Sequence, residues 1–464
     1  MSSPPPVTAA PPAGEADFLI YNALVLTLEP GSLALPQGYV AVKGSKIAAV
    51  GSAAASGPPL PARQLLDAQG ALVMPGLVNT HAHAAMVWFR GLADDLPLKS
   101  WLQDFIFPAE LGWLDEDKVY WGTLLAAAEM IQGGITTVQD SYFYEAGARR
   151  ALAASGLRAV AAQGVLDFPI PGVPDPKDNL RVAGEFMESG GDHSSGLITS
   201  TLFCHAPYTC GPDTLKKAKA MTRERGLPWF THLAETRQEV KDLQQQQGCT
   251  PAAYLDRLGL LDALTVVVHG VWLPPEDHEL LARRGVKVSH CPESNLKLAA
   301  GVAPIPDLLA EGVQVGLGTD GAASNNNLDL FGEMSLTARL HKVWRLDPTV
   351  LTAAQTVALA TREGAGVLGL EEVTGTLSPG KEADLAVLDL NQAHLTPLFD
   401  PYSHLVYAAR AGDVRHVMVA GRWLLRDREL LTLNWREIAG RSQEGSRELA
   451  AFCRSLQPPL PGKI

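Results

Sequence analysis

The chain has 464 residues, of which 46% are hydrophobic and 19% are charged, and its formal net charge is −12. This composition is typical of a globular protein, and without a cluster of lysines and arginines it argues against a nucleic-acid or anionic-membrane partner. No apolar run approaches the roughly 20 residues of a membrane-spanning helix, so we expect no membrane contact.

Residues 1–16 are rich in proline and alanine and are predicted to form a flexible tail. The tail has neither the basic start nor the apolar centre of a secretory signal peptide. The five cysteines are scattered and odd in number, namely Cys204, Cys210, Cys249, Cys291 and Cys453. This pattern favours reduced thiols over a disulfide framework, and hence a cytoplasmic protein.

One sequence pattern is shared by residues 17–72 and 373–430: short runs rich in β-branched residues alternate with Gly, Pro and Ser. Each stretch is too small to bury a core alone. We therefore predict that the two stretches, far apart in sequence, pair into one β-sandwich. Residues 431–464 follow as a C-terminal extension.

Residues 73–372 alternate between short apolar runs and helix-like stretches. Eight such runs occur: GLVNTH, ITTVQDS, RAVAAQGVLD, LITSTLFCHAP, LPWFTHLAE, LTVVVHGVW, VKVSHCP and VQVGLGTDG. Eight β–α alternations predict an α/β fold of the (β/α)₈ TIM-barrel type.

Potential metal ligands fall at the ends of these predicted strands. His81 and His83 end the first strand, and the later ends carry His205, His232, His269, His290 and Asp320. In a parallel barrel these ends form one face, where active sites lie. A lone histidine at a strand end is more often a satisfied polar residue than a ligand; for His290 both readings stay open, and for His205 we favour a substrate contact. His81, His83, His232 and Asp320 together predict a metal site.

Three imidazoles and one carboxylate suit a divalent transition metal, with zinc as the first choice. Ligand type alone leaves Fe²⁺ and Mn²⁺ open. A catalytic zinc lowers the pKa of a water toward about 7, which predicts hydrolytic chemistry. Glu235, three residues after His232, is either a general acid or a helix-start capping residue. We expect His269 to hold the water and Asp320 both to bind the metal and to accept the water's proton.

The chain resembles the amidohydrolase superfamily, and is most similar to its methylthioadenosine/S-adenosylhomocysteine deaminases, in six segments: PGLVNTHAHAAMVWFRGLADDLPLKSWLQDFIFPAE, HLAETRQEV, VVVHGVW, SHCPESNLKLAAG, GLGTDGAASNNNLDLFGEM and SPGKEADLAVLDL. The resemblance implies a distorted barrel beside a β-sandwich. It implies one zinc bound by His81, His83, His232 and Asp320. It assigns proton transfer onto the heterocycle to Glu235 and the water to His269.

The resemblance also implies substrate contacts. Glu110 would accept hydrogen bonds from ribose hydroxyls, although composition alone favours an exposed loop carboxylate. His205 would contact the substrate as well. Trp101, with Trp88 and Phe105, either lines a lid over the substrate or packs in an amphipathic helix. Members of this family are often homo-oligomers.

The implied reaction is hydrolytic deamination of a 6-aminopurine nucleoside, namely 5′-methylthioadenosine, S-adenosylhomocysteine or adenosine. Some family members carry an arginine in the third strand that helps to bind substrate, where this chain has Gln163. Glutamine offers no cationic fork to a carboxylate, so the homocysteine end of the substrate is in doubt. The alternatives are a related amidohydrolase acting on a triazine or on guanine, and a metal-free scaffold protein.

Overall fold

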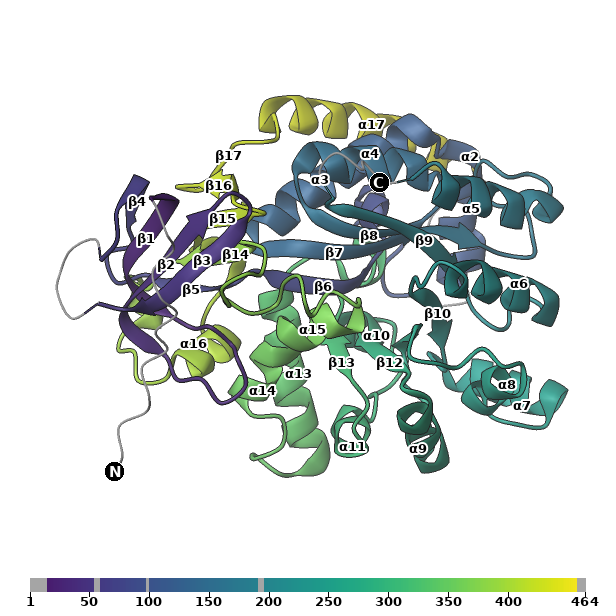
Figure 1. Ribbon diagram of the computed structural model, residues 1–464. Coiled ribbons are helices and arrows are strands. Elements are labelled where there is room, and N and C mark those ends of the chain that lie inside the picture. The colour runs from purple at the N-terminus through teal and green to yellow at the C-terminus, as the bar shows by residue number, and fades with distance from the viewer. Residues whose placement is uncertain (1–14, 54–58, 97–99, 191–195, 457–464) are drawn as a thin grey trace.

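The structure is a computed structural model that describes residues 15–53, 59–96, 100–190 and 196–456. The first 14 residues of the expected tail lie outside the described residues, and strand β1 begins at Ala16. Two sheets lie side by side, an eight-stranded parallel barrel and a nine-stranded mixed sheet (Figure 1). None of the described helices combines the length and apolarity that crossing a bilayer requires.

The eight predicted strands form the barrel, each parallel to its neighbours. In chain order they are β6 (Leu77–Ala82), β7 (Ile135–Tyr142), β8 (Arg158–Val165), β9 (Ile198–Cys204), β10 (Trp229–Leu233), β11 (Thr265–His269), β12 (Lys287–His290) and β13 (Val315–Leu317). The backbone N–H groups of Thr319 and Asp320 donate to the carbonyl of His81 at 3.1 and 3.0 Å, which closes the ring between the first and last strands. The expected barrel is therefore confirmed.

Close packing between the closing strands depends on one glycine. A Cβ on Gly318 would lie 2.9 Å from both the backbone nitrogen and the Cβ of His81. A side chain there would push the last strand away from the first. The ends of these two strands carry Asp320 and His81, so this contact sets the spacing of the predicted ligands.

Helices cover the outside of the barrel (Figure 1). They are α2 (Phe107–Trp113), α3 (Glu116–Gln132), α4 (Glu145–Ser155), α5 (Asn179–Glu188), α6 (Pro212–Arg223), α7 (Arg237–Gln247), α8 (Pro251–Arg257), α9 (Pro275–Arg284), α10 (Pro292–Lys297), α11 (Ile305–Ala310), α12 (Ala322–Asn325), α13 (Leu330–Arg345), α14 (Ala353–Leu359) and α15 (Arg362–Val367). Because helices cover one side and side chains fill the other, strands such as β6, β7 and β8 are buried at every position.

The second sheet joins the two ends of the chain, as predicted. Its strands are β1 (Ala16–Val25), β2 (Leu35–Lys43), β3 (Lys46–Ser52), β4 (Ala62–Asp67), β5 (Leu72–Pro75), β14 (Leu385–Leu388), β15 (Val414–Val419), β16 (Arg422–Arg426) and β17 (Glu429–Leu430). The two ends meet where β14 pairs antiparallel with β5, from Leu385 opposite Pro75 to Leu388 opposite Leu72. The sheet thus extends to Pro75, and the domain limits given above stay predictions.

A buried ion pair fastens this sheet to the barrel. Arg158 begins β8, at the end of the barrel opposite the strand ends that carry the predicted ligands. Its Nε and Nη2 donate to the two carboxylate oxygens of Asp384 at 2.8 and 3.2 Å. Arg158 therefore has a structural partner and lies far from the predicted site.

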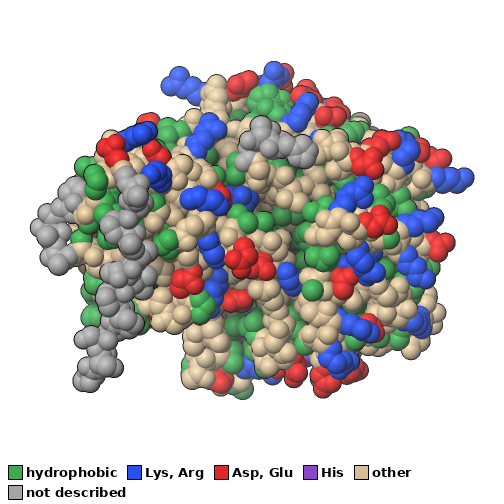
Figure 2. Space-filling model, viewed as in Figure 1, with side chains coloured by type: hydrophobic (Ala, Val, Ile, Leu, Met, Phe, Trp, Pro, Cys, Tyr) green, Lys and Arg blue, Asp and Glu red, His purple; other side chains and the backbone are tan. Residues whose placement is uncertain are grey.

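Helix α17 (Trp435–Ser455), in the C-terminal extension, runs along the outside of the barrel near α2 and α3 (Figure 1). The guanidinium of Arg441 lies 5.3 Å from the ring of Trp121 in α3. A short helix, α16 (Pro401–Tyr407), precedes β15. Acidic and basic side chains are interspersed over the face in Figure 2, where neither sign forms a continuous field.

Candidate active site

Three histidines bring ring nitrogens together at the carboxyl ends of the barrel strands. His81 lies in β6, His83 directly follows that strand, and His232 lies in β10. One ring nitrogen from each can be chosen so that all lie within 4.8 Å of one another. The Nε2 atoms of His81 and His232 are 3.3 Å apart.

The other ring nitrogens of His81 and His83 are occupied by strand β7. The Nδ1 atom of His81 lies 3.1 Å from Oε1 of Gln139, and Nδ1 of His83 donates to the backbone carbonyl of Ser141. Each contact fixes the ring so that its Nε2 faces the common centre, which is how metal-binding histidines are usually held. Sequence reasoning missed Gln139 and Ser141, because nothing in the motif ITTVQDS marks them as partners of a strand 58 residues earlier.

Asp320 completes the set from the end of β13. Its Oδ1 lies 3.7 Å from Nε2 of His81 and 3.4 Å from Nε2 of His83. Its Oδ2 accepts hydrogen bonds from the hydroxyls of Ser294 at 2.6 Å and Ser324 at 3.1 Å. The backbone of Asp320 is left-handed, with φ of 60°. Such strain costs about 1–3 kcal/mol and concentrates at functional sites.

The protonation states suit a divalent cation. Burial lowers the pKa of His81, His83 and His232, so these imidazoles are neutral near pH 7. Burial alone would raise the pKa of Asp320, but electrostatic interactions with the surrounding histidine rings and the hydrogen bond from Ser294 outweigh it and hold that pKa below its usual range. Neutral imidazoles beside an ionised carboxylate are the forms that bind metal. With no thiolate in the set, the donors fit zinc.

Glu235 reaches the same region through a strained turn. Strand β10 ends at Leu233, and Ala234 adopts a left-handed conformation with φ of 52° before α7 begins. The Oε2 atom of Glu235 lies 3.9 Å from Nε2 of His269. Burial raises the pKa of Glu235, which favours its protonated form. Glu235 can thus supply a proton at the cavity.

A second buried carboxylate holds this turn from outside the cavity. The two oxygens of Glu239 accept the backbone N–H groups of Ala234 and Glu235, each at 2.9 Å. Burial, and secondarily the charge of Glu235, raises the pKa of Glu239 to about 7. Sequence reasoning missed Glu239, although it stands three residues after the helix-capping Thr236, where an acidic residue often binds back to the backbone.

His269 is the last residue of β11 and lies beside these groups. Its Nδ1 is 3.0 Å from Oδ1 of Asn295 in α10, and its backbone is left-handed, with φ of 72°. The hydrogen bond orients the ring with Nε2 toward Glu235. Asn295 was another unpredicted partner, since it lies beyond the strand ends.

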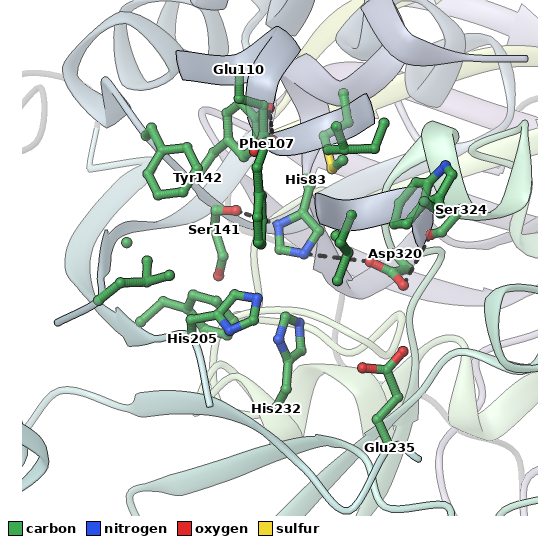
Figure 3. A pocket seen from close by; sticks show the side chains of 18 of the residues that line it. His83, Phe107, Glu110, Ser141, Tyr142, His205, His232, Glu235, Asp320 and Ser324 are labelled. Atoms are coloured by element: carbon green, nitrogen blue, oxygen red, sulfur yellow. Dashed lines mark hydrogen bonds and ion pairs between the residues drawn. The ribbon is translucent and has the colours of Figure 1, made fainter. Parts of the chain in front are cut away.

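A cavity opens at this face (Figure 3), with about 710 Å³ of empty space that includes its opening to solvent. The lining includes the predicted His83, Trp101, Glu110, His205, His232, Glu235, His269 and Asp320, and adds Met86, Leu102, Ile106, Phe107, Ser141, Tyr142, Phe143, Gly164, Leu166, Phe203, Tyr208, Leu298 and Ser324. Trp101 lies in a π-helical turn (Trp101–Ile106) that leads into α2.

Two predicted substrate contacts line the cavity, Glu110 as a buried residue and His205 as a partly buried one. Glu110 in α2 is 3% exposed and accepts a hydrogen bond from the hydroxyl of Tyr142 at 2.5 Å. Burial raises the pKa of Glu110 to about 7. His205 follows β9, and its Nδ1 lies 3.1 Å from the hydroxyl of Thr209. Burial lowers the pKa of His205 to about 3, so this ring is neutral.

His290 and Gln163, which the sequence analysis also considered, do not line the cavity. His290 is fully buried, does not line the cavity and packs against His341 with ring centroids 5.5 Å apart. The Oε1 atom of Gln163 accepts the backbone N–H of Glu145 at 3.1 Å, and its Nε2 donates to the carbonyl of Gly164. Gln163 is therefore held by the backbone and does not line the cavity.

Residues 72–424 match the sequence profile of the Amidohydrolase family. The chain belongs to the amidohydrolase family. A "5-methylthioadenosine/S-adenosylhomocysteine deaminase" of Syntrophobacter fumaroxidans is 47% identical over 429 residues, which cover 92% of this amidohydrolase and 97% of the relative. A "5′-deoxyadenosine deaminase" of Methanosarcina mazei is 41% identical, with 95% and 100% of the two chains covered.

The crystal structure of an adenosine deaminase from Xanthomonas campestris with bound zinc superposes on this amidohydrolase with a TM-score of 0.91. The two are 37% identical, and the match covers 95% of this chain and 100% of the other. The family and the deaminase relatives make this protein a metal-dependent hydrolytic deaminase. The donor set found above agrees with zinc as its cofactor.

Proposed function

We propose that this amidohydrolase deaminates 6-aminopurine nucleosides by hydrolysis, giving the inosine product and ammonia. The observation that carries the proposal is the content of one cavity. It is lined by His83, His232 and Asp320, by the proton-carrying Glu235 and, across the cavity, by the buried Glu110 (Figure 3), while the fully buried His81 lies directly behind, against His232. The metal ligands at one side of the cavity would act on the purine base, and the carboxylate at the other side would bind the hydroxyls of the attached ribose.

A zinc ion held by His81, His83, His232 and Asp320 would supply Lewis-acid activation of water at neutral pH. Asp320 would accept a proton from the water that attacks C6 of the purine. His269, oriented by Asn295, would hold that water by a hydrogen bond from Nε2. The side chains thus fix the attacking oxygen before reaction, which removes an entropic cost.

Glu235 would give its proton to N1 of the ring as the C6–oxygen bond forms. The ring then accepts the electron pair, and C6 becomes tetrahedral. The amine at C6 would take up the proton held by Asp320, the C6–nitrogen bond would break with loss of ammonia, and the proton of the C6 hydroxyl would pass to the ionised Glu235, which leaves the C6 carbonyl. The raised pKa of Glu235 supports this role, because it favours the protonated form that a general acid needs.

The cavity favours an uncharged 5′ substituent. Apolar side chains such as Leu102, Ile106 and Phe107 line it, and no lysine or arginine occurs among the described lining residues. Gln163 is held by the backbone of Glu145 and Gly164. We therefore propose 5′-methylthioadenosine and 5′-deoxyadenosine as better substrates than S-adenosylhomocysteine. Adenosine, whose 5′ group is also uncharged, is a further candidate substrate.

The rival substrates are a triazine or guanine, which share the metal chemistry. Neither has a ribose, so the buried pair of Glu110 and Tyr142 would bind no hydroxyl of the ligand. A metal-free scaffold would have no use for the hydrogen bonds by which Gln139 orients His81 and Ser294 orients Asp320, because such contacts serve to hold metal ligands in place.

We also propose that the enzyme is cytoplasmic. Its partners are small-molecule nucleosides, and it binds neither nucleic acid nor a membrane. All five cysteines are free, as a reducing compartment favours. Assembly into a homo-oligomer remains an expectation from the family resemblance.

A screen for ammonia release tests the proposal. Purified zinc-loaded protein is offered 5′-methylthioadenosine, 5′-deoxyadenosine, S-adenosylhomocysteine, adenosine, guanine and a chlorotriazine. We expect ammonia from the first two at the highest kcat/KM. Ammonia from guanine alone, or chloride from the triazine, would overturn the nucleoside assignment.

A further inference from the structure

We propose that Tyr142 is a substrate-binding residue: beside the ribose contact expected of Glu110, its hydroxyl oxygen accepts a hydrogen bond from one of the two hydroxyls of the 2′,3′-diol. This inference rests on the proposed nucleoside activity and extends it to a residue that neither the sequence motifs nor the chemistry at C6 calls for.

The geometry places the two residues as one unit on the cavity wall. Tyr142 ends β7 and Glu110 lies in α2, 32 residues earlier in the chain. The tyrosine hydroxyl donates to Oε1 of Glu110 at 2.5 Å, and both residues line the cavity while being 4% and 3% exposed. In Figure 3 they lie across the cavity from Glu235 and Asp320, where the sugar would lie if the base faces the metal ligands.

The hydrogen bond leaves two acceptors side by side. The single hydroxyl proton of Tyr142 is donated to Oε1 of Glu110, so the tyrosine oxygen can only accept a hydrogen bond from a ligand. The other carboxylate oxygen of Glu110 receives no hydrogen bond from the described residues. Two adjacent acceptors match two adjacent hydroxyl donors, as the 2′ and 3′ hydroxyls of ribose provide.

The apolar lining around Tyr142 and Glu110 raises the energetic cost of leaving their oxygens without hydrogen-bond donors. Phe107 and Phe143 line the same part of the cavity, and no described lysine or arginine lines it. Burial raises the pKa of Glu110 to about 7, and the hydrogen bond from Tyr142 opposes that rise. Buried acceptors without donors are costly, so a ligand that lacks a hydroxyl is penalised.

The competing explanation is that Tyr142 only tethers α2 to the barrel. Both explanations predict that Tyr142→Phe harms the enzyme. They differ in the dependence on the substrate, because a tether affects every substrate equally, whereas a hydroxyl contact disappears with the hydroxyl.

The test compares 5′-deoxyadenosine with its 2′-deoxy and 3′-deoxy derivatives, using the zinc-loaded wild type, Tyr142→Phe and Glu110→Gln. Tyr144→Phe is the matched control, since Tyr144 neighbours the site in sequence but does not line the cavity. We expect each missing hydroxyl to lower the wild-type kcat/KM by about 10–100-fold. In Tyr142→Phe, the loss for one derivative should shrink to about threefold or less while the loss for the other persists. Tyr144→Phe should keep the wild-type pattern.

Equal losses for all three substrates in Tyr142→Phe, or an unchanged pattern in that variant, would overturn the diol assignment. If Tyr142→Phe folds poorly, Glu110→Gln decides, because it should reduce the discrimination at the other hydroxyl. Failure of the wild type to release ammonia from 5′-deoxyadenosine, with a full complement of zinc, would overturn the proposed function and this inference together. Turnover with the wrong pattern overturns the inference alone.

Discussion

The carboxylate of Glu239 accepts the backbone N–H of Glu235 at 2.9 Å. Its other oxygen accepts the N–H of Ala234, the left-handed residue at which the chain turns from β10 toward the cavity. A residue outside the cavity thus fixes the backbone of the proposed proton donor. Glu239 is a positioning residue in this account, since it acts on the reaction through Glu235.

Glu239→Gln should replace one acceptor by a donor that faces a backbone N–H. A misplaced Glu235 is expected to cost about 100-fold in kcat, with KM and zinc content near wild type. Steady-state kinetics and metal analysis check this. Thr250→Ala is the control, because it removes the N-cap of the neighbouring α8 without touching the turn. If the two variants lose stability alike and both keep kcat, Glu239 is only a structural residue.

Glu235→Gln removes the proton but keeps the shape of the side chain. We expect kcat to fall by about 10²–10⁴-fold, as loss of a general acid does. The zinc content should not change, because Glu235 is absent from the ligand set. Loss of zinc in this variant would mean that Glu235 binds the metal.

Gln139→Ala should weaken metal binding. Gln139 contacts the ring nitrogen of His81 that faces away from the common centre. Loss of such a partner typically costs about 10–100-fold in metal affinity. Competition with a chelator measures it, and Gln163→Ala serves as the control on the neighbouring strand. Equal affinities in both variants would show that the contact does not orient His81.

Ligand affinity should depend on pH through Glu110. Its pKa is raised to about 7 by burial, so the carboxylate loses its acceptor form as the pH falls through that value. The inhibition constant of the product 5′-deoxyinosine should therefore rise below pH 7, by up to about tenfold per unit. Hypoxanthine, which has no ribose, is the control for other ionisations at the site. A parallel rise for both ligands would exclude Glu110 as the cause.

The ion pair between Arg158 and Asp384 should stabilise the contact between barrel and terminal sheet. The two side chains are 5% and 0% exposed. Asp384→Ala leaves the buried guanidinium with only the longer contact of its Nη2 to Oε2 of Glu382 at 4.0 Å, which should cost about 3–5 kcal/mol in the free energy of unfolding. Denaturant unfolding measures the loss. The folded fraction should keep its wild-type KM, since Arg158 begins a strand at the far end of the barrel; a raised KM would contradict that separation.

Much of the fold followed from periodicity and from the ends of strands. All eight barrel strands were predicted, because short runs rich in apolar and β-branched residues alternate regularly with helix-like stretches, even though strands such as β7 (ITTVQDSY) hold no continuous apolar run. His81, His83 and His232 converge because each lies at or just after a strand's carboxyl end. His290 met the same criterion and yet packs against His341, so position at a strand end is not sufficient.

The supporting residues could not be found in this way. Gln139, Asn295 and Glu239 act through contacts set by how neighbouring elements pack, and each looks like an ordinary polar residue in the sequence. Tyr142 ends a strand as the ligands do, but a tyrosine there is equally expected to pack. Three-dimensional contacts, and in Glu110 the burial of a carboxylate, were needed to separate these roles.

The central claim is hydrolysis at C6 by a metal held between His81, His83, His232 and Asp320. The most direct measurement is deamination of 5′-deoxyadenosine in ¹⁸O-labelled water, by protein first stripped of metal and then reloaded with zinc. We predict no turnover without metal, and after reloading an inosine product that carries one labelled oxygen at C6 with an equal amount of ammonia. Undiminished turnover by the stripped protein, or a product without the label, would contradict the account.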